Sequence, residues 1–165
     1  MSKITFLGAG STVFAKNVLG DCMFVAALDG FEFALFDIDE QRLRDSEKML
    51  SNLKESLGKN IRIKAYTDRK ESLRGAKYVI NAIQVGGYKP STVIDFEIPK
   101  KYGLRQTIAD TLGIGGIFRN LRTIPVMLDF ANDMEEVCPN ALFMNYTNPM
   151  AVLTGVMNRF TNINT

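Results

Sequence analysis

A glycine-rich turn near the start of the chain constrains the fold more than any other feature of the sequence. Residues 4–7 form a short apolar run that leads directly into Gly-Ala-Gly at 8–10, the pattern of a buried strand that ends in a tight turn. Apolar residues at helical spacing follow, and a second predicted strand over 31–36 ends at Asp37. A strand, a glycine turn, a helix, a strand and an acid in this order predict a Rossmann-type half-domain that binds a dinucleotide.

Each residue of this pattern has a predicted role. Gly8 allows the tight turn, Gly10 lets the backbone approach a pyrophosphate, and the helix N-terminus supplies free N–H groups and a partial positive charge. Asp37 is placed to accept hydrogen bonds from ribose hydroxyls, which favours NAD over NADP. Val13 stands where the motif has its third glycine, so we expect the helix and the strand to pack slightly farther apart. The alternatives are a turn without a ligand and a helix-capping role for Asp37.

The remaining predicted elements alternate between strands and helices. Strands are expected over 61–66, 78–83 and 141–144, and helices over 40–57, 91–102, 117–137 and 150–160. Such alternation predicts an α/β fold, a doubly wound parallel sheet with strand order 3-2-1-4-5, in one NAD-binding domain of residues 1–165. A sixth strand would come next, so the sequence is expected to be part of a longer protein, truncated before a C-terminal catalytic region.

Local signals place the ends of several helices. Ser11 or Thr12 can cap the first helix, and Asp39 is the predicted N-cap of the second. Pro125 lies inside the long helix predicted over 117–137, and a proline lacks the backbone N–H of a regular helical turn. We therefore expect that helix to kink or break near Thr123.

Polar segments follow the predicted fourth and fifth strands, where doubly wound folds bind their ligands. Residues 81–87 end the fourth strand beside the point at which the strand order reverses. Asn148 ends the fifth strand, and Pro149 restrains the backbone of Asn148 to an extended form. An asparagine with a fixed backbone suits hydrogen bonding to sugar hydroxyls. The alternative is an Asn-Pro pair that only forms a turn. Asp110 precedes a glycine-rich segment, either as part of a helix-capping loop or as an acid in an active-site wall. The predicted cofactor-binding residues are Gly8, Gly10, Ser11, Thr12, Val13, Phe14, Asp37, Ile38, Asn81, Gln84 and Val85.

The composition argues against several classes of function. The 165 residues contain no histidine, so by themselves they offer neither a Ser-His-Asp triad nor a His-ligated metal site. The net charge of +2 comes from scattered charges, which argues against a nucleic-acid partner. No apolar run approaches the roughly 20 residues that span a bilayer, and the first residues lack the pattern of a signal peptide. Cys22 and Cys138 lie far apart and are expected to be reduced thiols of a cytoplasmic protein.

Five longer stretches carry a pattern beyond the glycine turn. They are residues 3–14 (KITFLGAGSTVF), 34–43 (ALFDIDEQRL), 81–97 (NAIQVGGYKPSTVIDFE), 106–125 (QTIADTLGIGGIFRNLRTIP) and 145–151 (NYTNPMA). Together they resemble the NAD- and metal-dependent family 4 glycoside hydrolases, and within them the melibiase-type α-galactosidases. The last two stretches are the most specific, although Ile114 stands where the family pattern has the proline of GPGG.

The resemblance implies an unusual mechanism. NAD oxidises the 3-hydroxyl of the sugar, a base removes the proton on carbon 2, the aglycone leaves by elimination, water adds, and the hydride returns. It implies that Asn148 binds the substrate and that Asp110 raises the basicity of the catalytic base. Phosphosugar-cleaving members carry an arginine after the Gly-Gly pair and read NPAG, whereas this chain reads YKPST at 88–92 and NPMA at 148–151. The expected substrate is therefore an unphosphorylated α-galactoside such as melibiose.

The resemblance also implies what these residues lack. The family's metal ligands, a cysteine in a CHSV-like motif and a histidine in an NH motif, and its catalytic tyrosine lie beyond residue 165. Manganese is therefore expected only in the full-length enzyme, with no metal ligand in this chain, and the 165 residues alone are expected to be inactive. A homo-oligomer is expected, with apolar surface around Ile114, Ile117, Phe118 and Met150. The alternatives are a fragment of an NAD-dependent 2-hydroxy-acid dehydrogenase and a non-catalytic dinucleotide-binding remnant.

Overall fold

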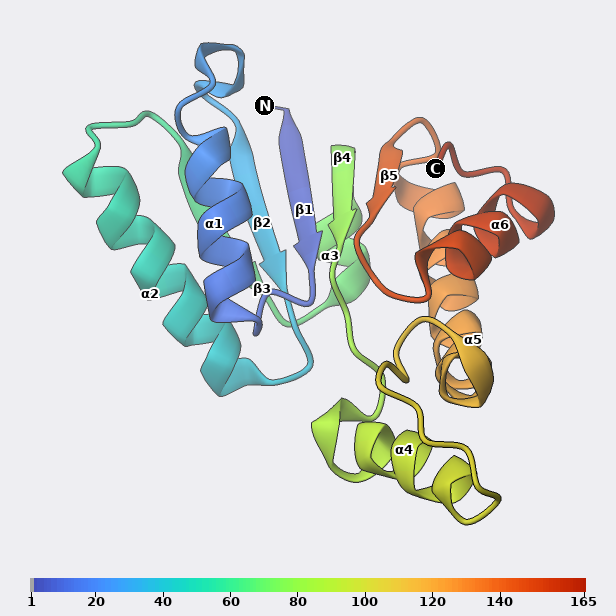
Figure 1. Ribbon diagram of the computed structural model, residues 1–165. Coiled ribbons are helices and arrows are strands. Elements are labelled where there is room, and N and C mark those ends of the chain that lie inside the picture. Colours follow the sequence, from blue (N-terminus) through green and yellow to red (C-terminus); the bar gives the residue numbers. More distant parts are fainter. Residues whose placement is uncertain (1) are drawn as a thin grey trace.

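Five parallel strands form one sheet at the centre of the molecule. The structure, a computed structural model, describes residues 2–165. The strands occur in the order β3-β2-β1-β4-β5, which confirms the predicted doubly wound α/β topology (Figure 1). Their bounds are β1 (Lys3–Leu7), β2 (Glu32–Phe36), β3 (Arg62–Tyr66), β4 (Ala76–Asn81) and β5 (Leu142–Asn145).

Helices cover both faces of the sheet, as a parallel sheet requires. Helices α1 and α2 lie on one face and α3, α5 and α6 on the other, whereas α4 lies beyond the end of the sheet to which the strand arrows point (Figure 1). The helices are α1 (Thr12–Cys22), α2 (Glu40–Ser56), α3 (Arg69–Leu73), α4 (Val93–Lys100), α5 (Gly113–Val137) and α6 (Met150–Phe160), with a short 3-10 helix η1 (Ala26–Leu28) and a π-helical segment η2 (Gly87–Thr92). Within residues 2–165, no helix is both long enough and apolar enough to cross a membrane.

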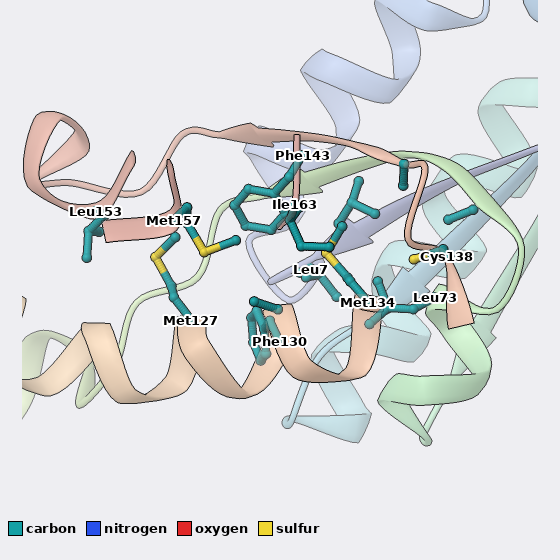
Figure 2. Packing of buried hydrophobic residues seen from close by; sticks show 14 residues of the cluster. Leu7, Leu73, Met127, Phe130, Met134, Cys138, Phe143, Leu153, Met157 and Ile163 are labelled. Carbon is teal, nitrogen blue, oxygen red and sulfur yellow. The ribbon is translucent and has the colours of Figure 1, made fainter. Parts of the chain in front are cut away.

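The alternation of side chains along each strand divides the core into two clusters. In β1, Phe6 packs with buried residues of α1 and α2, while the next residue, Leu7, packs on the opposite face. Figure 2 shows this second cluster, in which α5 contributes three large side chains against β5 and α6. Its largest members are Leu7, Leu73, Met127, Phe130, Met134, Phe143, Leu153, Met157 and Ile163. Burial on both faces anchors the sheet, so that the loops at the ends of its strands have a rigid base.

The two cysteines are unpaired thiols, as predicted. Cys138 belongs to the cluster of Figure 2 and is buried, whereas Cys22 is partly exposed on α1. Burial raises the pKa of the Cys138 thiol to about 11. At neutral pH this thiol is therefore protonated and serves as a small apolar side chain.

Several predicted boundaries need correction. Strand β4 ends at Asn81 rather than 83, because the chain leaves the ladder there and passes over the glycine turn, with the amide of Ala82 bonded to the carbonyl of Leu7. The helix predicted over 91–102 is shorter and follows the π-helical segment η2. The helix predicted to begin at 117 begins at Gly113. Asp39 caps α2 as predicted, accepting hydrogen bonds from the amides of Gln41 and Arg42.

Of the kink or break predicted near Thr123, the break is wrong. Helix α5 is continuous from Gly113 to Val137, with Pro125 inside it. A proline in a helix interior costs about 3 kcal/mol. Side chains on both sides of it, Ile124 and Met127, pack in the core cluster that lies between α5 and the sheet. Tertiary packing thus outweighs the local preference.

Candidate functional site

The glycine turn brings the ends of three strands into contact. The amides of Gly8 and Ala9 both donate to the carbonyl of Phe36, at 3.0 Å each, which ties the end of β1 to the end of β2. Gly8 has φ +90°, and a Cβ atom there would lie 2.7 Å from the carbonyl oxygen of Ala82. Only glycine fits this conformation and this close approach, so the predicted role of Gly8 in the tight turn is confirmed.

Asp37 contacts the same turn. Its Oδ2 accepts a hydrogen bond of 2.6 Å from the amide of Gly10, and its Oδ1 accepts one of 2.9 Å from the amide of Asp39. A Cβ atom on Gly10 would lie 2.7 Å from Oδ2, so the glycine admits the carboxylate itself. Each carboxylate oxygen can accept a further bond, and contact of Asp37 with a ribose stays a prediction. The neighbouring Ile38 is exposed beside this turn.

The first turn of α1 is open to a ligand. Ser11 occupies the N-cap position, but no side chain caps the helix, and the first turn contains no acid. Val13 is 71% exposed, so its side chain does not lie between the helix and the sheet, and the expected increase in their separation stays a prediction. Phe14 packs edge-on against Tyr146 with ring centroids 5.5 Å apart, which joins this turn to the loop after β5. Thr12 begins the helix beside them.

Asn81 organises the loop that follows β5. Its side chain is fully buried, and its Nδ2 donates to Asn145 Oδ1 at 3.0 Å and to Thr147 Oγ1 at 3.2 Å. Asn145 Oδ1 also accepts from the amide of Thr147, and Thr147 Oγ1 donates to the carbonyl of Ile83. Within residues 2–165, Asn81 Oδ1 has no partner. The network fixes the backbone that leads to Asn148, and direct contact of Asn81 with a cofactor stays a prediction.

Two predicted site residues meet at the carboxyl edge of the sheet. Asn148 Nδ2 donates to Asp110 Oδ2 at 3.2 Å, although all of α5 and β5 lies between the two residues in the sequence. A third residue, Arg119 of α5, donates from Nε to the carbonyl oxygen of Asn148 at 3.0 Å. The loops that carry Asp110 and Asn148 are therefore brought together. Sequence reasoning missed Arg119, because nothing in its spacing distinguished it from other arginines.

Two of these residues, Asp110 and Arg119, border a cavity of about 290 Å³. Asp110 and Arg119 line it together with Gln84, whose Nε2 donates to Thr92 Oγ1 at 3.2 Å. A larger cavity of about 510 Å³ adjoins it along α4, since both are lined by Tyr88, Thr92, Phe96 and Thr107. Val85 is partly buried in the same loop. The two cavities form a groove that begins at Gln84, shortly after the carboxyl end of β4, and continues along α4. Ligands bind at that end of the strands in this fold.

A buried ion pair attaches α4 to α5 behind this groove. Arg122 Nη1 and Nη2 donate to the two carboxylate oxygens of Asp95 at 2.8 and 2.6 Å, and Asp95 is 1% exposed. The hydrogen bonds with Asp95 raise the pKa of the Arg122 guanidinium. Gln106 extends the link, because its Nε2 donates to the carbonyl of Asp95 and its Oε1 accepts from the amide of Gly115. Sequence reasoning missed this pair, which supports the loop that carries Asp110.

The chain offers groups that fit a dinucleotide but none that complete a metal site. The glycine turn, the uncapped first turn of α1 and the carboxylate of Asp37 lie at adjacent strand ends, as a dinucleotide requires. Across residues 2–165, no three His, Cys, Asp or Glu side chains are close enough together to hold a metal ion.

Known proteins resemble the chain over its whole length. A model of the family 4 glycosyl hydrolases matches residues 3–165. An α-galactosidase of Bacillus subtilis (strain 168) is 70% identical over 165 residues, which are all of this chain and 38% of that protein. An α-galactosidase of Rhizobium meliloti (strain 1021) is 42% identical over 92% of this chain and 31% of its own length. The chain thus spans about a third of the length of these relatives.

Solved structures show the same fold. The 6-phospho-β-glucosidase of Thermotoga maritima, solved with manganese, NAD⁺ and glucose-6-phosphate, has a TM-score of 0.82 and is 25% identical; the match covers 97% of this chain and 37% of that protein. The family match decides against the dehydrogenase alternative. On these grounds the chain is a member of family 4 of the glycosyl hydrolases.

Proposed function

We propose that residues 1–165 form the NAD-binding region of an NAD- and manganese-dependent α-galactosidase. The hydrogen bond between Asp110 and Asn148 carries this proposal, because it joins two family motifs beside a cavity that Asp110 lines. Its support includes the 70% identity with the Bacillus subtilis α-galactosidase along the whole chain.

In this proposal the cofactor lies across the ends of β2, β1 and β4. When bound, NAD supplies a reversible hydride acceptor for the sugar hydroxyl. Asp37 accepts from a ribose, and the first turn of α1 faces the pyrophosphate with its free N–H groups and positive dipole. Gly8, Gly10, Ser11, Thr12, Val13, Phe14, Ile38, Asn81, Gln84 and Val85 surround or support that path.

The sugar binds beyond the cofactor, beside β5. Asn148 can both donate to and accept from sugar hydroxyls, and its orientation is set by Asp110 and by the network of Asn81. Asp110 acts through these contacts as a positioning acid. The described residues include no complete metal site, so we assign no metal-dependent step to them.

The charge of the smaller cavity favours an uncharged substrate. Its lining contains one acid, Asp110, and one base, Arg119, so their formal charges cancel. A phosphate would require additional cations to replace its hydration. Together with YKPST at 88–92 and NPMA at 148–151, this favours an unphosphorylated α-galactoside such as melibiose.

We also propose self-association and a cytoplasmic location. Ile114, Ile117 and Met150 are exposed, as predicted, whereas Phe118 is partly buried. Exposed apolar side chains of neighbouring elements favour association with another protein surface, and a second copy is the proposed partner. Two unpaired thiols favour a reducing compartment.

The activity of the whole protein tests the proposed function. With NAD and manganese, the whole protein should release nitrophenol from a nitrophenyl α-galactoside, and removing either cofactor should abolish turnover. The isolated 165 residues should show no turnover under the same conditions, because they lack a metal site. Hydrolysis of only 6-phosphorylated glycosides, or turnover by the isolated chain, would contradict the proposal.

Replacing Asp37 tests the assignment of the cofactor. Asp37→Ala should weaken NAD binding by about 1–3 kcal/mol, because it removes charge-assisted hydrogen bonds to a ribose. It should also reduce the preference for NAD over NADP, since the 2′-phosphate would no longer meet a carboxylate. Calorimetric titration of the whole protein measures both, with Asp29→Ala as the control, because Asp29 is exposed in the loop before β2. Unchanged NAD affinity in Asp37→Ala would remove Asp37 from the site.

A further inference from the structure

Arg119 has hydrogen-bonding capacity that the fold does not use. It is partly buried on α5 and lines the smaller cavity, and its Nε is occupied by the carbonyl oxygen of Asn148. In the part of the chain that the structure describes, Nη1 and Nη2 have no hydrogen-bond or ion-pair partner. Arg122, one turn later on α5, instead directs both Nη atoms to Asp95. The two arginines thus differ in the partners of their Nη atoms although they are neighbours on one helix.

Asp110 and Arg119 hold Asn148 from two sides. Asp110 accepts from the Asn148 side chain, and Arg119 donates to the Asn148 backbone. Both charged residues line the same small cavity, yet no ion pair joins them within residues 2–165. Because the guanidinium is not neutralised by that acid, its free N–H groups remain available to a third group in the cavity.

The position of Arg119 favours a sugar rather than the cofactor. The proposed dinucleotide path begins at Asp37, after β2, and crosses the ends of β1 and β4. Arg119 contacts the loop after β5, on the far side of β4 from that starting point. A ligand beside Asn148 and Asp110 is therefore the group that its Nη atoms can reach.

We propose that Arg119 is a sugar-contacting residue that determines specificity, donating from its Nη atoms to a hydroxyl oxygen of the glycoside held by Asn148. The inference rests on the proposed function and deepens it. A planar guanidinium with Nε fixed has its remaining donors pre-oriented, so it can select one hydroxyl by position. The formal charges of Asp110 and Arg119 cancel, which suits an uncharged sugar in the smaller cavity.

Kinetics with a panel of monodeoxy α-galactosides test the proposal in the whole protein. Arg119→Met should raise KM for the complete sugar about 10- to 100-fold, because it removes a hydrogen bond from a charged donor. For one member of the panel, the galactoside that lacks the contacted hydroxyl, this penalty should fall by about tenfold. The KM for NAD should stay unchanged. Arg159→Met serves as the matched control, since Arg159 is exposed in the last turn of α6.

Each outcome of this experiment decides between alternatives. A penalty that is equal for every sugar of the panel would show that Arg119 only positions Asn148 and would overturn the contact. A raised KM for NAD with an unchanged KM for the sugar would assign the guanidinium to the cofactor, which also overturns it. Arg119→Lys keeps the charge but not the planar guanidinium, so it should retain part of the rise in KM for the sugar. The melting temperature of this variant shows whether the protein is folded. A wild-type protein without α-galactosidase activity would refute the proposed function, and this inference with it.

Discussion

Replacing Arg122 by methionine is expected to lower the free energy of unfolding by about 3–5 kcal/mol, the effect of removing one partner of a buried ion pair. The reason is the carboxylate of Asp95, which is 1% exposed and would lose both charge-assisted hydrogen bonds. Its carbonyl is linked through Gln106 to the start of α5, so the loop that carries Asp110 should loosen as well. Denaturant unfolding followed by circular dichroism measures the change.

Two controls separate burial from charge. Arg44→Met removes an ion pair with Glu40 whose side chains are well exposed, and it should change the stability by less than about 1 kcal/mol. The double variant Asp95→Leu/Arg122→Met removes both charges and should recover much of the loss, since no unpaired carboxylate remains buried. A loss below about 1 kcal/mol for Arg122→Met would mean that water reaches Asp95 and that the pair does not support the groove.

Replacing Gly8 by alanine is expected to have a comparably large effect. The residue has φ +90°, a conformation that costs a non-glycine residue about 1–3 kcal/mol. The added Cβ would also lie 2.7 Å from the carbonyl oxygen of Ala82, and overpacking against backbone costs typically about 1–3 kcal/mol more. The ends of β1 and β4 must separate to relieve this contact, so NAD binding should weaken together with stability.

Gly30→Ala is the matched control for this substitution. Gly30 has φ +79°, but a Cβ atom there would meet nothing within 4 Å. It therefore reports the cost of the left-handed backbone alone, and the difference between the two variants reports the close contact of the turn with β4. Equal destabilisation of the two variants would contradict the claim that Gly8 is required by the neighbouring strand.

The site illustrates why some residues could be predicted and others could not. Asp39 was predictable as a cap because its partners, the amides of Gln41 and Arg42, are two and three residues away. The contact of Asp110 with Asn148 had only partial sequence support: each residue lies in a recognisable motif, but nothing local says that they touch. Arg119 lies within one of those motifs, yet its role depends on the backbone of a loop that follows the next strand.

The sequence by itself determined the alternation of strands and helices, the strand order and the glycine turn, because these depend on periodicity, on turn chemistry and on the handedness of crossovers. Only the tertiary structure decided that Gly10 admits the carboxylate of Asp37, that α5 continues through Pro125, and that Asp95 pairs with Arg122. Each of these depends on atoms that are distant in sequence. Their interactions form only when the chain folds and excludes water. Burial then makes an unpaired polar group costly, so few arrangements of the neighbouring side chains satisfy its hydrogen bonds.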